Sequence, residues 1–253
     1  MVFNAMIIHC HLPASLMETV IVPIVKDKKG DLSAADNYRP IAITSILSKV
    51  LELLVLKRHE DLFYTTCNQF GFKPKLGTEQ CIFTLKQVIE YYKSNNSPIY
   101  LCFLDLSKAF DRVDHSLLFR KLLDRGMPSI IVRIFEEWYT SQSFVVKWGS
   151  CVSMPFQVTN GVRQGGILSP KLFNVFIDDL SVLLRQDLYG CHFNNECFNH
   201  LFYADDSVLL ATSPAALQHL ITTCYEYFRS HGLLINVKKK LTIWQYCLLL
   251  LKT

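Results

Sequence analysis

The alternation of apolar and polar residues predicts helices and strands that follow one another along the whole chain. Residues 17–25 (METVIVPIV) and 99–104 (IYLCFL) are nearly continuous apolar runs of strand length, which is typical of strands buried in a sheet. Apolar residues recur at helical spacing over residues 45–63 and 78–93. The chain is therefore expected to have a mixed α/β (α+β) fold.

Capping and turn residues define further elements. Asp114 has the character of an N-cap for a helix over 115–124, and Gly126 follows at the position where a helix commonly ends. Ser169 and Pro170 have the character of a cap and a first helical residue. The other predicted elements are helices over 130–139 and 214–230, a strand pair 144–148 with 154–158, and a hairpin 200–203 with 208–212.

Composition indicates a folded chain in a reducing compartment. Of 253 residues, 50% are hydrophobic and 12% aromatic, which excludes intrinsic disorder. No apolar run approaches the roughly 20 residues of a membrane span, and the start does not resemble a signal peptide. The nine cysteines are scattered, as in proteins of the nucleus or cytoplasm, so we expect an intracellular protein. The net charge of +4 is compatible with a polyanionic partner.

Three carboxylates adjoin apolar strands. Asp105 follows the run 99–104, and Asp205 and Asp206 lie at the tip of the predicted hairpin. Carboxylates in such places are costly unless they are paired, hydrogen-bonded or bound to metal. If the two strands are antiparallel neighbours, Asp105 and Asp205 come together, and their hard oxygen atoms suit Mg²⁺. The alternative is that each aspartate caps a strand or turn.

Several blocks of sequence occur in an order and spacing that are typical of one family. They are VIVPIVKDKKGD, NYRPIAITSILSKVLE, NQFGFKPKLGTEQCI, FLDLSKAFDRVDH, NGVRQGGILSPKLFNVFIDDL, FYADDSVLL and HGLLINVKKK. In these blocks the chain resembles the reverse transcriptase domain of non-LTR (LINE-like) retrotransposons, over roughly residues 3–243. The resemblance implies a right-hand polymerase fold with fingers, palm and an antiparallel palm sheet.

The resemblance also suggests how the chain is divided. Residues 1–253 would form one reverse transcriptase domain, with fingers at about 1–97 and palm with finger insertions at 98–240. Residues 241–253 form a divergent tail, because IWQYCLLLLKT does not look like the family's continuation. No thumb is recognisable, so we expect a truncated fragment derived from a retrotransposon.

The resemblance assigns the catalytic and metal-binding residues. Asp105 and Asp205 would bind two Mg²⁺ ions, or Mn²⁺, with help from the carbonyl of Leu106 and from Asp206. Lys239 matches a lysine proposed to protonate the pyrophosphate leaving group. The alternative for Lys239 is that it belongs to a solvated basic run.

The resemblance likewise assigns nucleotide-binding residues. Lys26 and Arg39 would hold the triphosphate, and Gln164 and Gly165 would position the incoming nucleotide or the template base. Phe110 would be a steric gate whose ring excludes a ribose 2′-hydroxyl group. The alternatives are solvated basic residues, a tight turn before a helix and a core phenylalanine.

The implied activity is RNA-directed DNA polymerisation, in which a primer 3′-hydroxyl attacks the α-phosphorus of a deoxynucleoside triphosphate. The expected partners are an RNA template, a DNA primer and deoxynucleoside triphosphates, with no membrane and no indicated protein partner. One alternative is a catalytically inactive remnant that binds nucleic acid. A viral-type RNA-dependent RNA polymerase is disfavoured by Phe110 and by Ala204 before the aspartates. A small two-metal phosphohydrolase is supported by the carboxylates alone.

Overall fold

The chain forms two compact units, each assembled from two separate segments. The computed structural model describes residues 2–193, 196–236 and 242–246. Unit 1 comprises Met1–Tyr64 and Phe110–Phe173, and unit 2 comprises Thr65–Ala109 and Asn174–Thr253. The third boundary along the chain, between Phe173 and Asn174, falls inside α7 (Ser169–Gln186). Within the described residues, no helix combines the length and apolar character needed to cross a membrane.

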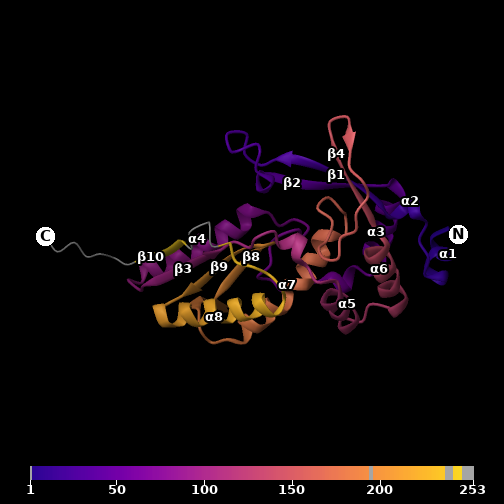
Figure 1. Cartoon of the computed structure of the whole chain (residues 1–253). Coiled ribbons are helices and arrows are strands. Elements are labelled where there is room, and N and C mark those ends of the chain that lie inside the picture. Colours follow the sequence, from indigo (N-terminus) through magenta and orange to yellow (C-terminus); the bar gives the residue numbers. More distant parts are fainter. Residues whose placement is uncertain (1, 194–195, 237–241, 247–253) are drawn as a thin grey trace. The chain divides into compact units, whose positions relative to one another are not determined.

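Unit 1 contains a four-stranded sheet in the order β2-β1-β4-β5, in which β1 and β2 form the long hairpin drawn in indigo in Figure 1. The β1–β2 pair is antiparallel, and the β1–β4 pair is parallel. The strands are β1 (Glu18–Val25), β2 (Tyr38–Thr44), β4 (Ser143–Trp148) and β5 (Cys151–Val152). The strand predicted over 17–25 is confirmed.

The predicted strand 144–148 is confirmed as β4, but its strand partner is β5 and not the predicted segment 154–158. The chain reverses directly after β4, where Gly149 has a φ of +59° and Trp148 pairs with Cys151. Glycine takes such a φ without steric cost, so it permits a tight hairpin. Of the predicted partner segment, Phe156 pairs with Phe144 in an isolated antiparallel bridge, through two backbone hydrogen bonds of 2.9 Å.

Five α-helices belong wholly to unit 1 within the described residues, and buried aromatic side chains such as Phe135 and Trp138 lie in its core. Asp114 caps α5 as predicted, because its Oδ1 accepts a hydrogen bond from the backbone N–H of Leu117 at 2.8 Å. Gly126 follows the helix with a φ of +86°. The helices are α1 (Val2–His9), α2 (Ala14–Met17), α3 (Ile46–Arg58), α5 (His115–Asp124) and α6 (Ser129–Ser141), with short 3-10 helices at Ala35–Asn37, Glu60–Phe63 and Ala109–Arg112.

Helix α3 exposes much of the apolar stripe that predicted it. Ile46 is 79% exposed and Leu47 52% exposed, whereas the residues buried on α3 are Ser48, Leu51, Glu52 and Val55. The helix predicted over 45–63 is confirmed over 46–58, and residues 60–63 form a separate 3-10 helix. The buried side of α3 includes a serine and a glutamate. The apolar spacing alone does not identify that side.

Unit 2 is built on an antiparallel sheet in the order β10-β3-β9-β8. Helices α4 and α8 cover its two faces (Figure 1), which explains why 99–104 is apolar throughout. The elements are α4 (Thr78–Ser94), β3 (Ile99–Leu104), β8 (His200–Tyr203), β9 (Asp206–Ala211), α8 (Pro214–Ser230) and β10 (Thr242–Tyr246), with a small pair β6 (Cys191–Phe193) and β7 (Glu196–Phe198). The predicted hairpin and both helices are confirmed. The expected divergent tail supplies β10.

Candidate active site

The three predicted carboxylates lie at one end of the unit 2 sheet. Asp105 directly follows β3, Asp205 lies in the turn between β8 and β9, and Asp206 begins β9. Strands β3 and β9 are antiparallel neighbours, with Leu104 paired to Ser207. This register confirms that the strand before Asp105 and the hairpin are adjacent, and it brings Asp105 next to Asp206 along the sheet edge.

The donor atoms at this edge suit a hard divalent cation, since Mg²⁺ prefers carboxylate oxygen atoms. Asp105 and Asp205 are half-buried, and Asp206 is exposed. Across residues 2–193, 196–236 and 242–246, however, no three His, Cys, Asp or Glu side chains are arranged to hold a metal ion. The metal-binding roles of these aspartates and of the Leu106 carbonyl therefore stay predictions.

Asp105 is held by the segment that follows α8. Asn236 donates a hydrogen bond from Nδ2 to Asp105 Oδ2 at 2.8 Å, and its backbone N–H donates to the Asp105 carbonyl, also at 2.8 Å. Leu106 forms an antiparallel bridge with Ile235. Nothing in the sequence predicted this role of Asn236 beyond its place in the block HGLLINVKKK. Lys239 of the same block lies outside the described residues.

The turn that carries Asp205 has an unusual backbone. Tyr203 pairs with Asp206, which leaves Ala204 and Asp205 as a two-residue hairpin loop. Ala204 has a φ of +58° and is buried. In a two-residue hairpin, glycine is the usual residue at a first central position with positive φ, so alanine needs support from its surroundings.

Gln69 contacts this turn from the loop before α4. Its side chain is 1% exposed. Its Oε1 accepts hydrogen bonds from the backbone N–H groups of Ala204 at 2.9 Å and Gly71 at 2.8 Å. No chemical signal in the sequence predicted this role beyond the position of Gln69 in the block NQFGFKPKLGTEQCI.

In unit 1, Gln164 and Gly165 lie in the loop before α7 and against β2. The Gln164 carbonyl accepts a hydrogen bond from the Ala42 backbone N–H at 2.7 Å, and Gln164 Nε2 donates to Asp111 Oδ1 at 2.8 Å. Gly165 has a φ of +112°, and a Cβ there would lie 2.9 Å from the Ala42 carbonyl oxygen. This close approach requires glycine.

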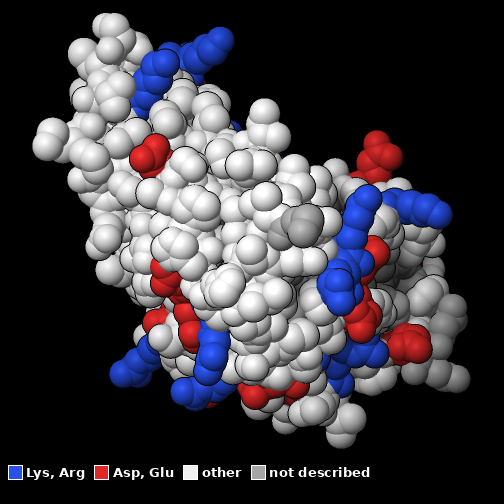
Figure 2. All heavy atoms as spheres, turned by 90° about the vertical axis from the view of Figure 1, so that its right-hand side faces the viewer, with Lys and Arg blue, Asp and Glu red and all other residues white. Residues whose placement is uncertain are grey.

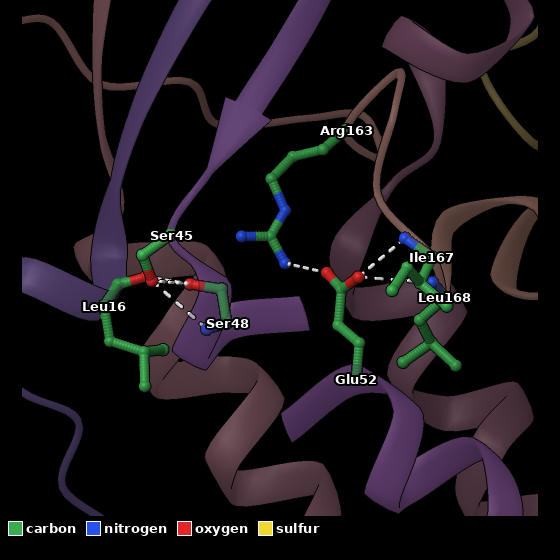
Figure 3. Close-up of polar contacts among 7 residues, drawn as sticks. All are labelled: Leu16, Ser45, Ser48, Glu52, Arg163, Ile167 and Leu168. Atoms are coloured by element: carbon green, nitrogen blue, oxygen red, sulfur yellow. Dashed lines mark hydrogen bonds and ion pairs between the residues drawn. The ribbon is translucent and has the colours of Figure 1, made fainter. Parts of the chain in front are cut away.

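The same loop is anchored by a buried ion pair (Figure 3). Arg163 Nη2 lies 2.6 Å from Glu52 Oε1, and the two side chains are 3% and 1% exposed. Glu52 Oε2 accepts a hydrogen bond from the Ile167 backbone N–H at 2.6 Å. Ser169 is predicted as the N-cap of this helix, but α7 begins at Ser169 itself. The Glu52 carboxylate on α3 accepts the backbone hydrogen bond just before the helix.

Aromatic side chains enclose this ion pair. The Arg163 guanidinium lies 4.2 Å from the centre of the Trp138 ring, in cation–π geometry. Burial raises the pKa of Tyr139 to about 12, and the charge of Glu52 acts in the same direction while that of Arg163 opposes it. The pair is thus in an environment with little water, where removal of either charge is costly.

The remaining predicted nucleotide-binding residues also belong to unit 1. Lys26 and Arg39 are exposed on the β1–β2 hairpin, and Lys26 Nζ donates a hydrogen bond to the Asp36 carbonyl at 2.8 Å. The half-buried Phe110 ring stacks on Phe173, with ring centres 4.6 Å apart. The stack holds the Phe110 ring in place. A fixed ring is expected both of a steric gate and of a core residue.

The predicted residues are therefore divided between the units. The carboxylates belong to unit 2, and Lys26, Arg39, Phe110, Gln164 and Gly165 belong to unit 1. On the face shown in Figure 2 the centre is largely uncharged, and lysine and arginine side chains form separate groups near the edges, in part beside acidic ones.

Comparison with known proteins identifies relatives over most of the chain. A family model described as reverse transcriptase (RNA-dependent DNA polymerase) matches residues 26–248, which confirms the resemblance and carries it past residue 243. The chain is 30% identical to the retrovirus-related Pol polyprotein from type-1 retrotransposable element R2 of Popillia japonica, over 93% of this chain and 33% of that protein. It is 29% identical to that from type-2 retrotransposable element R2DM of Drosophila melanogaster, over 92% of this chain and 22% of that protein. The chain thus spans a third or less of these relatives.

Solved structures share the fold. Apo telomerase from Candida tropicalis, truncated from its C-terminal domain, superposes with a TM-score of 0.61 at 13% identity, over 93% of this chain and 51% of that one. Telomerase from the same organism in complex with a fragment of telomeric RNA gives the same TM-score, over 92% of this chain and 41% of that one. The likeness confirms the predicted polymerase fold with fingers and palm.

Proposed function

The chain belongs to the reverse transcriptase family, and from this premise we propose that it carries out RNA-directed DNA polymerisation. The observation that carries the proposal is the placement of Asp105, Asp205 and Asp206 at one end of the unit 2 sheet. The substrates would be an RNA template, a DNA primer and deoxynucleoside triphosphates. The telomerase that shares this fold was solved with a telomeric RNA fragment, which supports a nucleic-acid template.

Asp105 and Asp205, with Asp206 and the Leu106 carbonyl beside them, are the proposed ligands of Mg²⁺ or Mn²⁺. When bound, a pair of such ions stabilises the attacking and leaving oxygen atoms of a phosphoryl transfer. Asn236 orients the Asp105 carboxylate through its hydrogen bond at 2.8 Å. Lys239 is the proposed proton donor to pyrophosphate.

Residues of unit 1 are proposed to bind the incoming nucleotide. Lys26 and Arg39 would contact the triphosphate, because lysine and arginine side chains donate charge-assisted hydrogen bonds to phosphate oxygen atoms. The Phe110 ring would exclude a 2′-hydroxyl group, so the chain would prefer deoxynucleotides. Gln164 and Gly165 would position the nucleotide or the template base, with Gly165 held against β2.

Primer extension on an RNA template tests the proposal. Asp205→Asn keeps the size of the side chain and removes its charge, so extension should fall at least about 100-fold, as when a group that stabilises the transition state is removed. The matched control is Asp179→Asn, an exposed position on α7, which should extend like the parent. Equal extension by Asp205→Asn and the parent would overturn the proposal, and template binding without extension would favour the inactive nucleic-acid-binding alternative.

A further inference from the structure

We infer that Gln69 is a positioning residue that fixes the turn Tyr203–Asp206, and through it the places of the Asp205 and Asp206 carboxylates. The importance of these places rests on the proposed function. The hydrogen bonds themselves do not depend on it, so the two can be tested separately.

The turn needs an external support because its backbone is strained. Ala204 has a φ of +58°, a region that residues with a Cβ occupy at a cost. Strained residues persist where the surrounding structure over-determines them, and they cluster at functional sites. A loop of two residues between paired strands has few contacts of its own with which to meet that cost.

Gln69 supplies the support through both ends of its amide. Oε1 accepts from the Ala204 N–H at 2.9 Å, and Nε2 lies 3.4 Å from the Ala204 carbonyl, which it approaches as a donor. The backbone adds two hydrogen bonds of 2.8 Å, from Phe202 N–H to the Asn68 carbonyl and from Phe70 N–H to the Phe202 carbonyl. The loop before α4 therefore extends the sheet beside β8 and meets the turn at its strained residue.

The support is itself packed tightly. A Cβ on Gly71 would lie 2.4 Å from the Ala204 backbone nitrogen, so only glycine allows this approach. Asn174 Nδ2 donates a hydrogen bond to the Gly71 carbonyl at 2.8 Å. Gln69, Gly71 and Asn174 are all buried, which leaves the turn little freedom to shift while these contacts hold.

Amide hydrogen exchange of the turn tests whether Gln69 holds it. Gln69→Met keeps the length of the side chain and removes the acceptor, so exchange of the Ala204 amide should accelerate about 10-fold or more. The control is Asn199→Leu, which removes another buried side-chain amide of unit 2, one whose Nδ2 donates to the Leu184 carbonyl at 2.6 Å. Unchanged exchange in Gln69→Met, or equal acceleration in both variants, would overturn the inference.

The consequence for the carboxylates is read from Mn²⁺ binding, followed by electron paramagnetic resonance, and from primer extension. Gln69→Met should weaken Mn²⁺ binding and lower kcat about 10- to 100-fold with little change in the KM for deoxynucleotides, because a small displacement of reacting groups has effects of this size. Asn199→Leu should match the parent in both measurements. If exchange accelerates selectively while Mn²⁺ affinity and kcat stay at parent values, positioning is disproved. If Asp205→Asn extends primers as well as the parent, the proposed function fails, and the exchange comparison still decides whether Gln69 holds the turn.

Discussion

The loop 163–168 of unit 1 and the turn 203–206 of unit 2 both carry predicted site residues, and they are fixed by different chemistry. In the loop, a buried carboxylate, Glu52, bonds a buried guanidinium and a backbone amide. In the turn, the neutral amide of Gln69 bonds the backbone on both sides of Ala204. The loop is held by charged groups, which must remain paired. The turn is held by neutral groups, which can lose a partner without leaving an uncompensated charge.

This difference predicts different consequences of damage. Removing one partner of a buried ion pair leaves an uncompensated charge, at a cost of about 3–5 kcal/mol. Removing a neutral acceptor leaves unsatisfied N–H groups, at about 1–3 kcal/mol. Damage to the loop should therefore lower the stability of unit 1 as a whole, whereas damage to the turn should act mainly on the site.

The largest effect is expected from Glu52→Ala. Arg163 would be left buried without its partner, so the free energy of unfolding in urea should fall by about 3–5 kcal/mol. The double variant Glu52→Met with Arg163→Met removes both charges and should recover a substantial part of that loss. If the single variant costs less than about 1 kcal/mol, the ion pair is not what anchors the loop.

Gly71→Ala should disturb the turn while it leaves most of the stability intact. The new methyl group would meet the Ala204 nitrogen at 2.4 Å, so the turn must move, and we expect primer extension to fall about 100-fold. Gly232→Ala is the control, because Gly232 has a φ of +68° but open space around its Cβ position. It should lower stability by about 1–2 kcal/mol without a matching loss of extension. Similar losses of extension in both variants would contradict a role for Gly71 at the turn.

A buried neutral histidine in unit 2 should make the stability of the chain depend on pH. His200 lies between Ser181 Oγ at 2.6 Å and Asn199 Oδ1 at 2.7 Å, and burial lowers its pKa to about 3. In the unfolded state the histidine pKa is near 6.5. Between that pH and the lowered pKa of the folded state, the unfolded chain therefore binds a proton that the folded chain does not. Stability from this group is therefore complete above about pH 6.5 and decreases as the pH falls toward 3.

The measurement is the free energy of unfolding as a function of pH. Between pH 6.5 and 4.5 the parent should lose about 2 kcal/mol through His200, and His200→Gln should lose correspondingly less over the same interval. His115→Gln serves as a comparison in unit 1, where burial lowers the pKa of a less deeply buried histidine. An unchanged pH slope in His200→Gln would show that this network tolerates charge.

The sequence predicted the helices and strands better than it predicted the buried side chains that hold the site segments in place. Strand β3 and helix α8 match their predicted bounds, because continuous apolar runs and capped amphipathic helices are local signals. The carboxylates were recognisable because charge next to an apolar strand is locally anomalous. Glu52 and Gln69 were not, because each bonds backbone or side chains more than 100 positions away. Polar residues inside helical or loop segments look solvated until the tertiary fold buries them.

The smallest effect is expected from Asn236→Ala, which tests whether the partner of Asp105 acts like Gln69. The variant loses the Nδ2 hydrogen bond to Asp105 Oδ2 but keeps the backbone N–H bond to the Asp105 carbonyl. Because the backbone still holds the segment, we expect the rate of primer extension to fall only about 5-fold, equivalent to about 1 kcal/mol.

Leu234→Ala is the matched control, since Leu234 is 51% exposed and supports Ser107 through its backbone carbonyl. It should extend like the parent. A loss in Asn236→Ala as large as that in Gly71→Ala would mean that one side-chain hydrogen bond at Asp105 matters as much as the whole support of the turn. The site would then depend on the orientation of a single carboxylate more than on the shape of the hairpin beside it.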